Sequence, residues 1–242
     1  MDGLADEVVV VTGGASGIGA AVVERLLHEG ARPVAWDLAI EDAGTDAMAV
    51  DVTDEDAVRD ALAQVRAATG PVTGFVNCAG VMGTPARIAD LRVAAVQSVF
   101  DVNSTGVLVT MKHVLAAMVE HGRADGGHLP GIVNVASNAA LRARTGLGPY
   151  AASKAAVLAW TRTAAHEYGR HGIRVNAVCP GGTRTPMMDG VADDTAQALA
   201  RTIPLGRFAA PEEIASVVVF LLSADAAYVS GASVVVDGAA TA

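Results

Sequence analysis

The chain of 242 residues has little cysteine, few aromatic side chains and few charged ones. Its two cysteines, Cys78 and Cys179, stand far apart and form no Cys-x-x-Cys pair, which argues against a disulfide scaffold and against a cysteine-paired zinc site. We therefore expect two reduced, buried thiols in a cytoplasmic protein. The first residues are acidic and apolar runs such as residues 217–222 are short, so the sequence predicts neither a signal peptide nor a membrane-spanning segment.

Positive charge is also in short supply, with 17 Lys and Arg against 26 Asp and Glu and a formal net charge of -9. An acidic chain repels a phosphate backbone, so we expect no nucleic-acid partner. Hydrophobic residues make up 52% of the chain, which is enough to bury a large core. The same excess predicts that part of the surface is hidden in an oligomer.

Short runs of β-branched residues alternate with stretches that have helical spacing. Strands are predicted at residues 8–11, 33–36, 48–50, 72–76, 132–135, 173–178 and 234–236, and helices at 18–29, 54–68, 89–100, 102–120, 150–169 and 211–222. Such alternation is typical of a parallel sheet covered by helices on both faces. We therefore predict an α/β fold, with residues 1–242 forming a single doubly wound, Rossmann-type domain.

Two long loops interrupt this pattern, at residues 121–130 and 181–204. In doubly wound sheets, ligands bind beyond the carboxyl ends of the strands. Because residues 181–204 follow a predicted strand, we expect them to form a substrate lid.

A glycine-rich segment, Thr12-Gly13-Gly14-Ala15-Ser16-Gly17-Ile18-Gly19, joins the first strand to the first helix. Glycines in this context let the backbone approach a pyrophosphate, and the N–H groups of the helix N-terminus face its negative charge. The predicted contacts of the cofactor are Gly13, Ser16, Gly17, Ile18 and Gly19.

Asp37 ends the second strand, 18 residues after Gly19. A carboxylate there can accept hydrogen bonds from both adenosine ribose hydroxyls and would repel a 2′-phosphate, and neither Ser16 nor Leu38 adds a positive charge. The sequence therefore favours NAD over NADP. The predicted groove continues through residues at the ends of the next two strands: Asp51, Val52, Asn77, Ala79 and Gly80.

The strongest catalytic signal is Tyr150-Ala151-Ala152-Ser153-Lys154, because positions i and i+4 share one helix face. A tyrosine is a poor base at neutral pH, and we expect the nearby ammonium to lower its pKa. Ser137 ends the fifth strand and can hold the substrate oxygen while Tyr150 passes the proton. Asn103 can tie a water molecule to Lys154.

Taken together, these residues resemble the short-chain dehydrogenase/reductase family over the whole chain. The matching positions are Thr12-Gly13-x-x-x-Gly17-x-Gly19, Asn77-Cys78-Ala79-Gly80, Asn103, Ser137, Tyr150-x-x-x-Lys154, Pro180-Gly181, Gly206-Arg207, Pro211-Glu212-Glu213-Ile214-Ala215 and Val236-Asp237-Gly238. Cys78, in place of a common asparagine, and Ala239, in place of a usual glycine, depart from the pattern.

The resemblance implies hydride transfer between nicotinamide C4 and a carbinol or carbonyl carbon. It implies that Tyr150 is the acid/base, that Lys154 also binds the nicotinamide ribose, that Ser137 polarises the substrate oxygen and that Asn103 anchors the proton relay. Contacts to the nicotinamide carboxamide are implied for Pro180, Gly181, Thr183 and Thr185. The family also implies a homotetramer.

The substrate is less well defined, and the residues that we expect near it are Asn138, Arg144, Leu147 and Met187. Several stretches resemble 2,3-dihydro-2,3-dihydroxybenzoate dehydrogenases, which favours a cyclic secondary alcohol, with Arg144 binding an anionic group. Arg144 pointing into solvent is the alternative. Two other functions stay open, a 3-oxoacyl-thioester reductase and a catalytically silent NAD-sensing protein.

Overall fold

The computed structural model describes residues 1–40, 46–122, 130–189 and 193–242. Its centre is a seven-stranded sheet of order β3-β2-β1-β4-β5-β6-β7, in which all neighbours run parallel. The strands are β1 (Val8–Thr12), β2 (Arg32–Asp37), β3 (Ala47–Ala49), β4 (Gly74–Asn77), β5 (Gly131–Val135), β6 (Arg174–Pro180) and β7 (Ser233–Val236). The order reverses between β1 and β4, which creates a crevice at the carboxyl ends of these strands.

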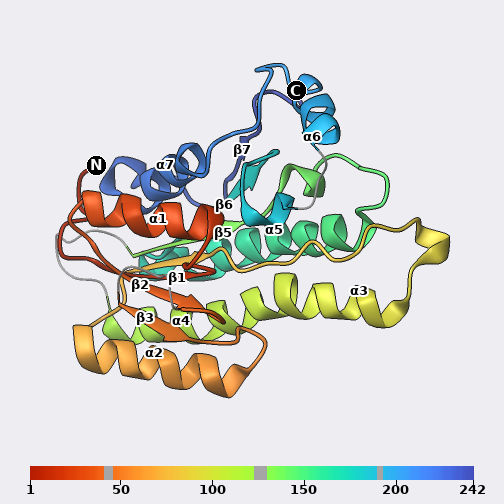
Figure 1. Cartoon of the computed structure of the whole chain (residues 1–242). Helices are drawn as coiled ribbons and strands as arrows, with labels where there is room; N and C mark the ends of the chain where they lie inside the picture. The colour runs from red at the N-terminus through yellow and green to blue at the C-terminus, as the bar shows by residue number, and fades with distance from the viewer. Residues whose placement is uncertain (41–45, 123–129, 190–192) are drawn as a thin grey trace.

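Helices cover both faces of the sheet, as Figure 1 shows, with α1 and α7 on one face and α2, α4 and α5 on the other. The helices are α1 (Gly17–His28), α2 (Glu55–Thr69), α3 (Val93–Phe100), α4 (Gly106–His121), α5 (Gly148–Tyr168), α6 (Asp193–Arg201) and α7 (Pro211–Leu222). Short 3-10 turns include η3 (Asn138–Ala140) and η5 (Pro186–Met188), and a π-helical turn η2 (Asp101–Thr105) joins α3 to α4.

The alternation of side chains along β1 explains why both faces are covered. Val8 and Val10 belong to the core beneath α2, α4 and α5, whereas Val9 and Val11 belong to the core beneath α1 and α7. Successive side chains of a strand point to opposite faces, so an unbroken run of valines requires helices on both. This is the physical basis of the predicted fold, which the structure confirms.

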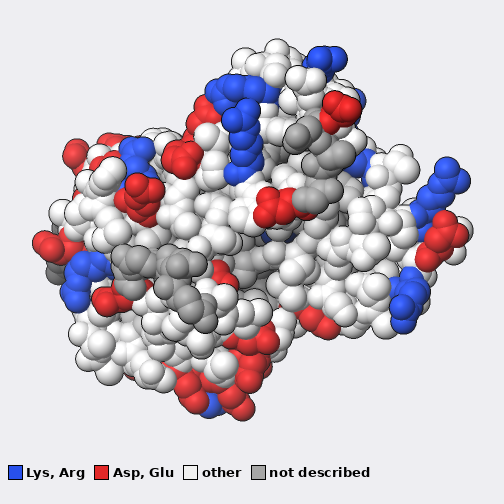
Figure 2. All heavy atoms as spheres, viewed as in Figure 1, with Lys and Arg blue, Asp and Glu red and all other residues white. Residues whose placement is uncertain are grey.

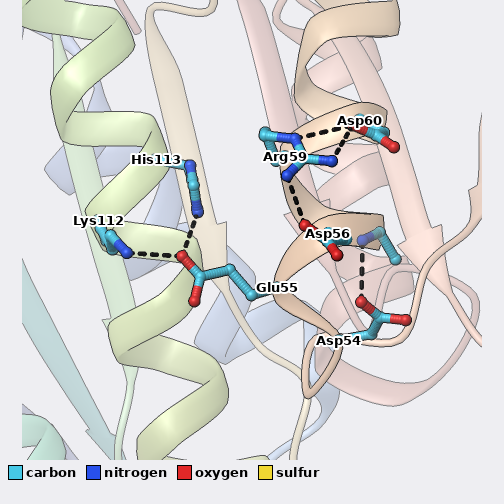
Figure 3. Close-up of polar contacts among 8 residues, drawn as sticks. Asp54, Glu55, Asp56, Arg59, Asp60, Lys112 and His113 are labelled. Carbon is cyan, nitrogen blue, oxygen red and sulfur yellow. Dashed lines mark hydrogen bonds and ion pairs between the residues drawn. The ribbon is translucent and has the colours of Figure 1, made fainter.

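Ionic contacts between the first turn of α2 and the middle of α4 reinforce the packing of these helices (Figure 3). Glu55 accepts hydrogen bonds from Lys112 Nζ at 2.6 Å and lies 2.9 Å from His113 Nε2. Asp54 caps α2 by accepting a hydrogen bond from the backbone N–H of Ala57. These contacts are exposed, so each adds little stability.

The excess of negative charge is visible on the surface shown in Figure 2. Acidic side chains gather at its lower edge, over the start of α2. The acidic residues at the N-cap and in the first turns of α2 are Asp54, Glu55, Asp56 and Asp60.

Every predicted strand and helix is present, with ends shifted by up to four residues. Two differences affect the loops. Residues 181–204 contain η5 and α6, whereas we expected an irregular lid, and residues 190–192 lie outside the described residues. Most of the other predicted loop, residues 123–129, also lies outside them.

One helical stretch is longer than the analysis of apolar runs anticipated. Val93–His121, which comprises α3, η2 and α4, has 29 residues, and its most apolar 18-residue window has a mean hydropathy of 1.3, enough by length and composition to cross a membrane. Of its most apolar window, 56% is buried within the described part of the chain, where α3 and η2 pack against α5 and α4 against α2. Its apolar character is that of a core helix.

Candidate active site

A cavity of about 700 Å³ opens at the crevice where the strand order reverses. Its volume lies within the range of ligand sites, about 300–1,000 Å³. Most of the predicted site residues line it: Gly13, Ser16, Gly17, Ile18, Asp37, Leu38, Asp51, Val52, Ala79, Gly80, Ser137, Asn138, Arg144, Leu147, Tyr150, Lys154, Pro180, Gly181, Thr183, Thr185 and Met187. Residues from distant parts of the sequence thus line one cavity.

The glycines bring the loop after β1 into close contact with the loop after β4. A Cβ atom at Gly13, which has a φ of 65°, would lie 2.9 Å from the backbone nitrogen of Ala79. The hydroxyl of Thr12 accepts hydrogen bonds from the backbone N–H groups of Cys78 and Ala79, and so holds the two loops together. The resulting glycine cradle ends at the N-terminus of α1, which fits the pyrophosphate of a dinucleotide.

Asp37 reaches the cavity from the end of β2 and is fixed by two backbone hydrogen bonds. Its carboxylate accepts from the N–H of Ala15 at 3.1 Å and from the N–H of Leu38 at 2.8 Å. The charged residues that line the cavity in the described part of the chain are Asp37, Asp51, Arg144 and Lys154. Since Asp51 follows β3, beside β2, this end of the cavity is acidic.

The catalytic candidates come from β5 and α5. Ser137 follows β5, and its hydroxyl accepts a hydrogen bond from the N–H of Ala139 at 3.1 Å. Ser137 also interacts with Tyr150 in a way that favours the phenolate. Lys154 Nζ donates to the carbonyl of Val135 at 2.8 Å and lies 6.0 Å from the centre of the Tyr150 ring. The structure thus brings the predicted serine, tyrosine and lysine together on one wall.

Burial dominates the acid–base properties of this group. It lowers the pKa of Lys154 to about 8, so the ammonium holds its proton less tightly than a lysine in water. Burial also raises the pKa of Tyr150 above its ordinary value, although the hydrogen bond from Ser137 opposes the shift. The expected lowering of the Tyr150 pKa is therefore wrong for the protein alone, because desolvation of the phenolate by burial is the largest cause of the shift.

Three predicted site residues do not line the cavity. Gly19 packs against the glycine loop, where a Cβ atom would lie 1.9 Å from the carbonyl oxygen of Gly13, so its role is close packing. Asn77 is buried and bonds Asn134 and Thr110. The Asn77 side chain thus links β4 to β5 and lies beneath the cofactor groove.

Asn103, the third, lies in the π-helical turn η2, a geometry that is frequent at functional sites. Its side chain is fully buried and bonds both backbone groups of Val81 and the hydroxyl of Ser153. Asn103 is nevertheless next to the lysine, since a Cβ atom built on Gly80 would lie 3.2 Å from Asn103 Oδ1 and 3.3 Å from Lys154 Nζ. Its role as a water anchor stays a prediction.

Much of the apolar wall was not predicted from the sequence. The further lining residues include Val81, Met82, Val102, Gly182 and Pro186. Val81 and Met82 directly follow the predicted Asn77–Gly80 stretch, and Pro186 precedes Met187, so adjacency was the available signal. Around the reacting group the cavity thus offers apolar walls and a few polar atoms.

A glycine cradle at a helix N-terminus, beside a serine, a tyrosine and a lysine on one wall, defines a nicotinamide-dependent oxidoreductase of the Rossmann type.

The comparisons with known proteins agree. A family model described as enoyl-(acyl carrier protein) reductase matches residues 13–241. The cis-4-hydroxycyclohexanecarboxylate dehydrogenase of Sinomonas cyclohexanicum is 39% identical over 252 residues, covering 100% of this chain and 99% of that protein. The acetoacetyl-CoA reductase of a Synechocystis species is 38% identical over 240 residues, covering 98% and 97%. The ligand-free aldohexose dehydrogenase of Thermoplasma acidophilum has a TM-score of 0.88 and 30% identity, covering 97% of this chain and 94% of that one.

The chain belongs to the short-chain dehydrogenase/reductase family. It is an oxidoreductase of the kind that acts on CH–OH groups.

Proposed function

We propose that the protein is an NAD-dependent dehydrogenase that oxidises a cyclic secondary alcohol to a ketone. The observation that carries this proposal is the wall formed by Ser137, Tyr150 and Lys154 in the same cavity as Asp37. The Sinomonas relative, whose name specifies a hydroxyl group on a cyclohexane ring, supports the substrate class.

In this proposal the chain's own residues hold the alcohol and move its proton. Ser137 bonds the substrate oxygen, and Tyr150 takes the hydroxyl proton in oxidation and returns it in reduction. Lys154 binds the nicotinamide ribose, while Asn103 anchors the proton relay. When bound, the nicotinamide supplies the hydride acceptor. The apolar walls limit the access of water to the reacting group.

The remaining cofactor contacts follow from position in the cavity. Gly13, Ser16, Gly17 and Ile18 would surround the pyrophosphate, and Asp51, Val52, Ala79 and Gly80 would line the adenosine side. Pro180, Gly181, Thr183 and Thr185 would hold the nicotinamide carboxamide. These assignments rest on the lining of the cavity and on the family pattern.

NAD is the proposed cofactor because Asp37 is an ordered carboxylate at the acidic end of the cavity. Its two oxygens are oriented by the N–H groups of Ala15 and Leu38 and keep further lone pairs for the ribose hydroxyls. A 2′-phosphate placed there would face this negative charge. Replacing Asp37 with Ala and Leu38 with Arg is expected to shift the preference towards NADP.

The proposed substrate also carries an anionic group, which Arg144 binds. Arg144 lines the cavity, and the turn after it is tied to the loop after β4 by the hydrogen bond from Ala86 N–H to the Gly146 carbonyl. Leu147 and Met187 then pack against the ring. Arg144→Leu is expected to raise KM strongly for an acidic alcohol and to leave a neutral one unchanged. Arg162→Leu, which removes the same charge from an exposed residue that does not line the cavity, is the control.

The proposed assembly is a cytoplasmic homotetramer. Exposed apolar side chains that support it lie on α4, on α7, on β7 and in the loop before β7: Leu108, Phe220, Val235 and Tyr228. Light scattering at micromolar concentration is expected to give the mass of four chains, and a monomer would contradict it.

The function is tested by mixing the protein with NAD or NADP and a panel of secondary alcohols and following reduced nicotinamide by absorbance. Oxidation of cyclic alcohols with NAD is expected. Faster turnover with NADP would overturn the cofactor assignment. Faster reduction of a 3-oxoacyl thioester would favour the reductase function that the Synechocystis relative represents. Binding of NAD without any turnover would favour a sensing protein.

A further inference from the structure

The segment that follows β7 contacts the loop that follows the catalytic serine. Asp237 accepts a hydrogen bond from Asn138 Nδ2 at 3.1 Å and another from Thr241 Oγ1 at 2.8 Å, both on the same carboxylate oxygen. Arg142 donates to the carbonyl of Ala240. The hydrogen bond between Asn138 and Asp237 thus joins two residues that are 99 positions apart in the sequence, and it is buried.

Asp237 packs so closely that its position is strongly constrained. A Cβ atom at Gly181 would lie 2.6 Å from the Cβ of Asp237, and the backbone N–H of Gly181 donates to the carbonyl of Val236. On the other side, a Cβ atom at Gly238 would lie 2.8 Å from Ile203 Cγ2. Asp237 therefore cannot move away from Asn138 without shifting the Pro180-Gly181 loop.

The carboxylate of Asp237 is ionised at neutral pH. Burial raises its pKa, but the hydrogen bonds from Asn138, Thr241 and the backbone N–H groups of Ala239 and Ala240 outweigh burial and hold the pKa below its ordinary value. An ionised carboxylate only accepts hydrogen bonds. The amide of Asn138 must therefore present its nitrogen to Asp237, which fixes which way the amide is turned.

The other end of that amide is available to a ligand. Asn138 lines the cavity although the residue as a whole is buried. In the described part of the chain Asn138 Oδ1 accepts no hydrogen bond, and it is not among the buried polar atoms that lack a partner, so the atom retains accessible surface. This unpaired carbonyl oxygen beside Ser137 can therefore accept a hydrogen bond from a ligand bound in the cavity.

We propose that Asp237 is a positioning residue that turns the Asn138 amide so that Asn138 Oδ1 accepts a hydrogen bond from a second hydroxyl group of the substrate. The substrate class is then a diol, oxidised at one carbon and recognised at its neighbour. This inference rests on the proposed dehydrogenase function and adds a specificity determinant to it.

The test compares a cyclic diol, cis-cyclohexane-1,2-diol, with cyclohexanol in a double-mutant cycle of Asn138→Ala and Asp237→Ala. Each single variant is expected to lower kcat/KM for the diol by about five- to tenfold, the effect of one lost neutral hydrogen bond, with little change for cyclohexanol. The double variant is expected to be no worse than the singles, because Asp237 acts through Asn138. If the two residues served packing alone, each variant would lower kcat/KM for the diol and for cyclohexanol alike. The losses of the two single variants would then add up in the double variant.

Thr241→Val is the matched control, since it removes a hydrogen bond from the same oxygen of Asp237 but leaves Asn138 bonded. Thr241→Val is expected to keep the preference for the diol. Asp237→Asn can still accept a hydrogen bond from Asn138 and is expected to retain more of this preference than Asp237→Ala. It replaces Asp237→Ala if that variant does not fold.

Equal losses for diol and cyclohexanol in Asn138→Ala, or additive losses in the double variant, would overturn the inference. If the unmodified protein oxidises neither alcohol nor any other in the wider panel with NAD, the proposed function has failed. If it oxidises cyclohexanol and the diol equally well, the dehydrogenase function stands and the inference fails.

Discussion

β5 and α5 carry two buried polar clusters whose hydrogen bonding differs. The first, the amide network, joins Asn134 of β5 to Asn77, Thr161 and Met111, and Asn77 in turn to Thr110. The second, the catalytic group, contains Ser137, Tyr150 and Lys154. Asn134 uses both ends of its side chain within the protein, whereas Lys154 has three donors and, among the residues that the structure describes, makes one hydrogen bond, to Val135.

The difference separates structural from functional polar groups within one pair of elements. A buried polar group whose partners are all supplied by the protein stabilises the fold and has nothing left for a ligand. A buried group with donors to spare costs stability, and such groups gather where a ligand completes them. The comparison predicts that variants of the catalytic group lose activity while variants of the amide network lose stability.

The largest effect is expected for Tyr150→Phe, which removes the proton-transfer group and keeps the ring. Turnover should fall by about 100- to 10,000-fold, the typical contribution of a general acid–base group. The dissociation constant for NAD, measured by titration, and the midpoint of thermal unfolding should be nearly unchanged. A rate within tenfold of the unmodified enzyme would overturn the mechanism.

The opposite outcome is expected for Asn134→Ala. The substitution removes the acceptor of the Asn77 amide nitrogen and one partner of the Thr161 hydroxyl, which still donates to the carbonyl of Val157. The expected cost is about 1–3 kcal/mol in the free energy of unfolding. Denaturant unfolding measures this loss, and kcat of the protein that remains folded should be retained. The exposed amide of Gln97 is the control, since Gln97→Ala should change stability by less than about 0.5 kcal/mol. Equal losses of stability in Asn134→Ala and Gln97→Ala would contradict the structural role of the amide network.

The smallest effect concerns the pH dependence of stability. Burial lowers the pKa of Lys154 to about 8 in the folded protein, whereas an unfolded chain holds that proton up to its ordinary value of 10.5. Above pH 8 the unfolded state therefore binds more protons, and stability rises with pH. Between pH 8 and 9 this contribution is about 1 kcal/mol.

Lys154→Met should remove the rise in the free energy of unfolding between pH 8 and 9, and it should abolish turnover. The free energies of unfolding of the unmodified protein and of the variant, measured at pH 8 and at pH 9, test this. The window ends near pH 9 because the pKa values of Cys78 and Cys179 are raised to about 11, so these buried thiols lower stability above that point. An identical pH slope in the two proteins would contradict the low pKa of Lys154.

The sequence predicted the sheet well because its strands are buried on both faces and appear as β-branched runs. It predicted α6 poorly, since this short helix is polar and lies between turn-forming residues. It also assigned Asn77 to the groove, although strand periodicity cannot tell which neighbour a terminal side chain meets. The bond between Asn138 and Asp237 has no local signal at all, because the residues are distant in sequence and only the folded sheet brings them together.

The pairing of β1 with both β2 and β4 also bears on how the chain folds. Val9 and Gly74 are register partners, so β1 must close a loop of more than sixty residues before its second edge is paired. Loop-closure entropy of this kind slows folding more than it lowers stability. The N–H groups of Cys78 and Ala79 reach Thr12 only after that closure, so we expect the dinucleotide cradle to form late in folding. Helices form in microseconds, whereas the slow kinetic phase of refolding should track the appearance of nicotinamide binding.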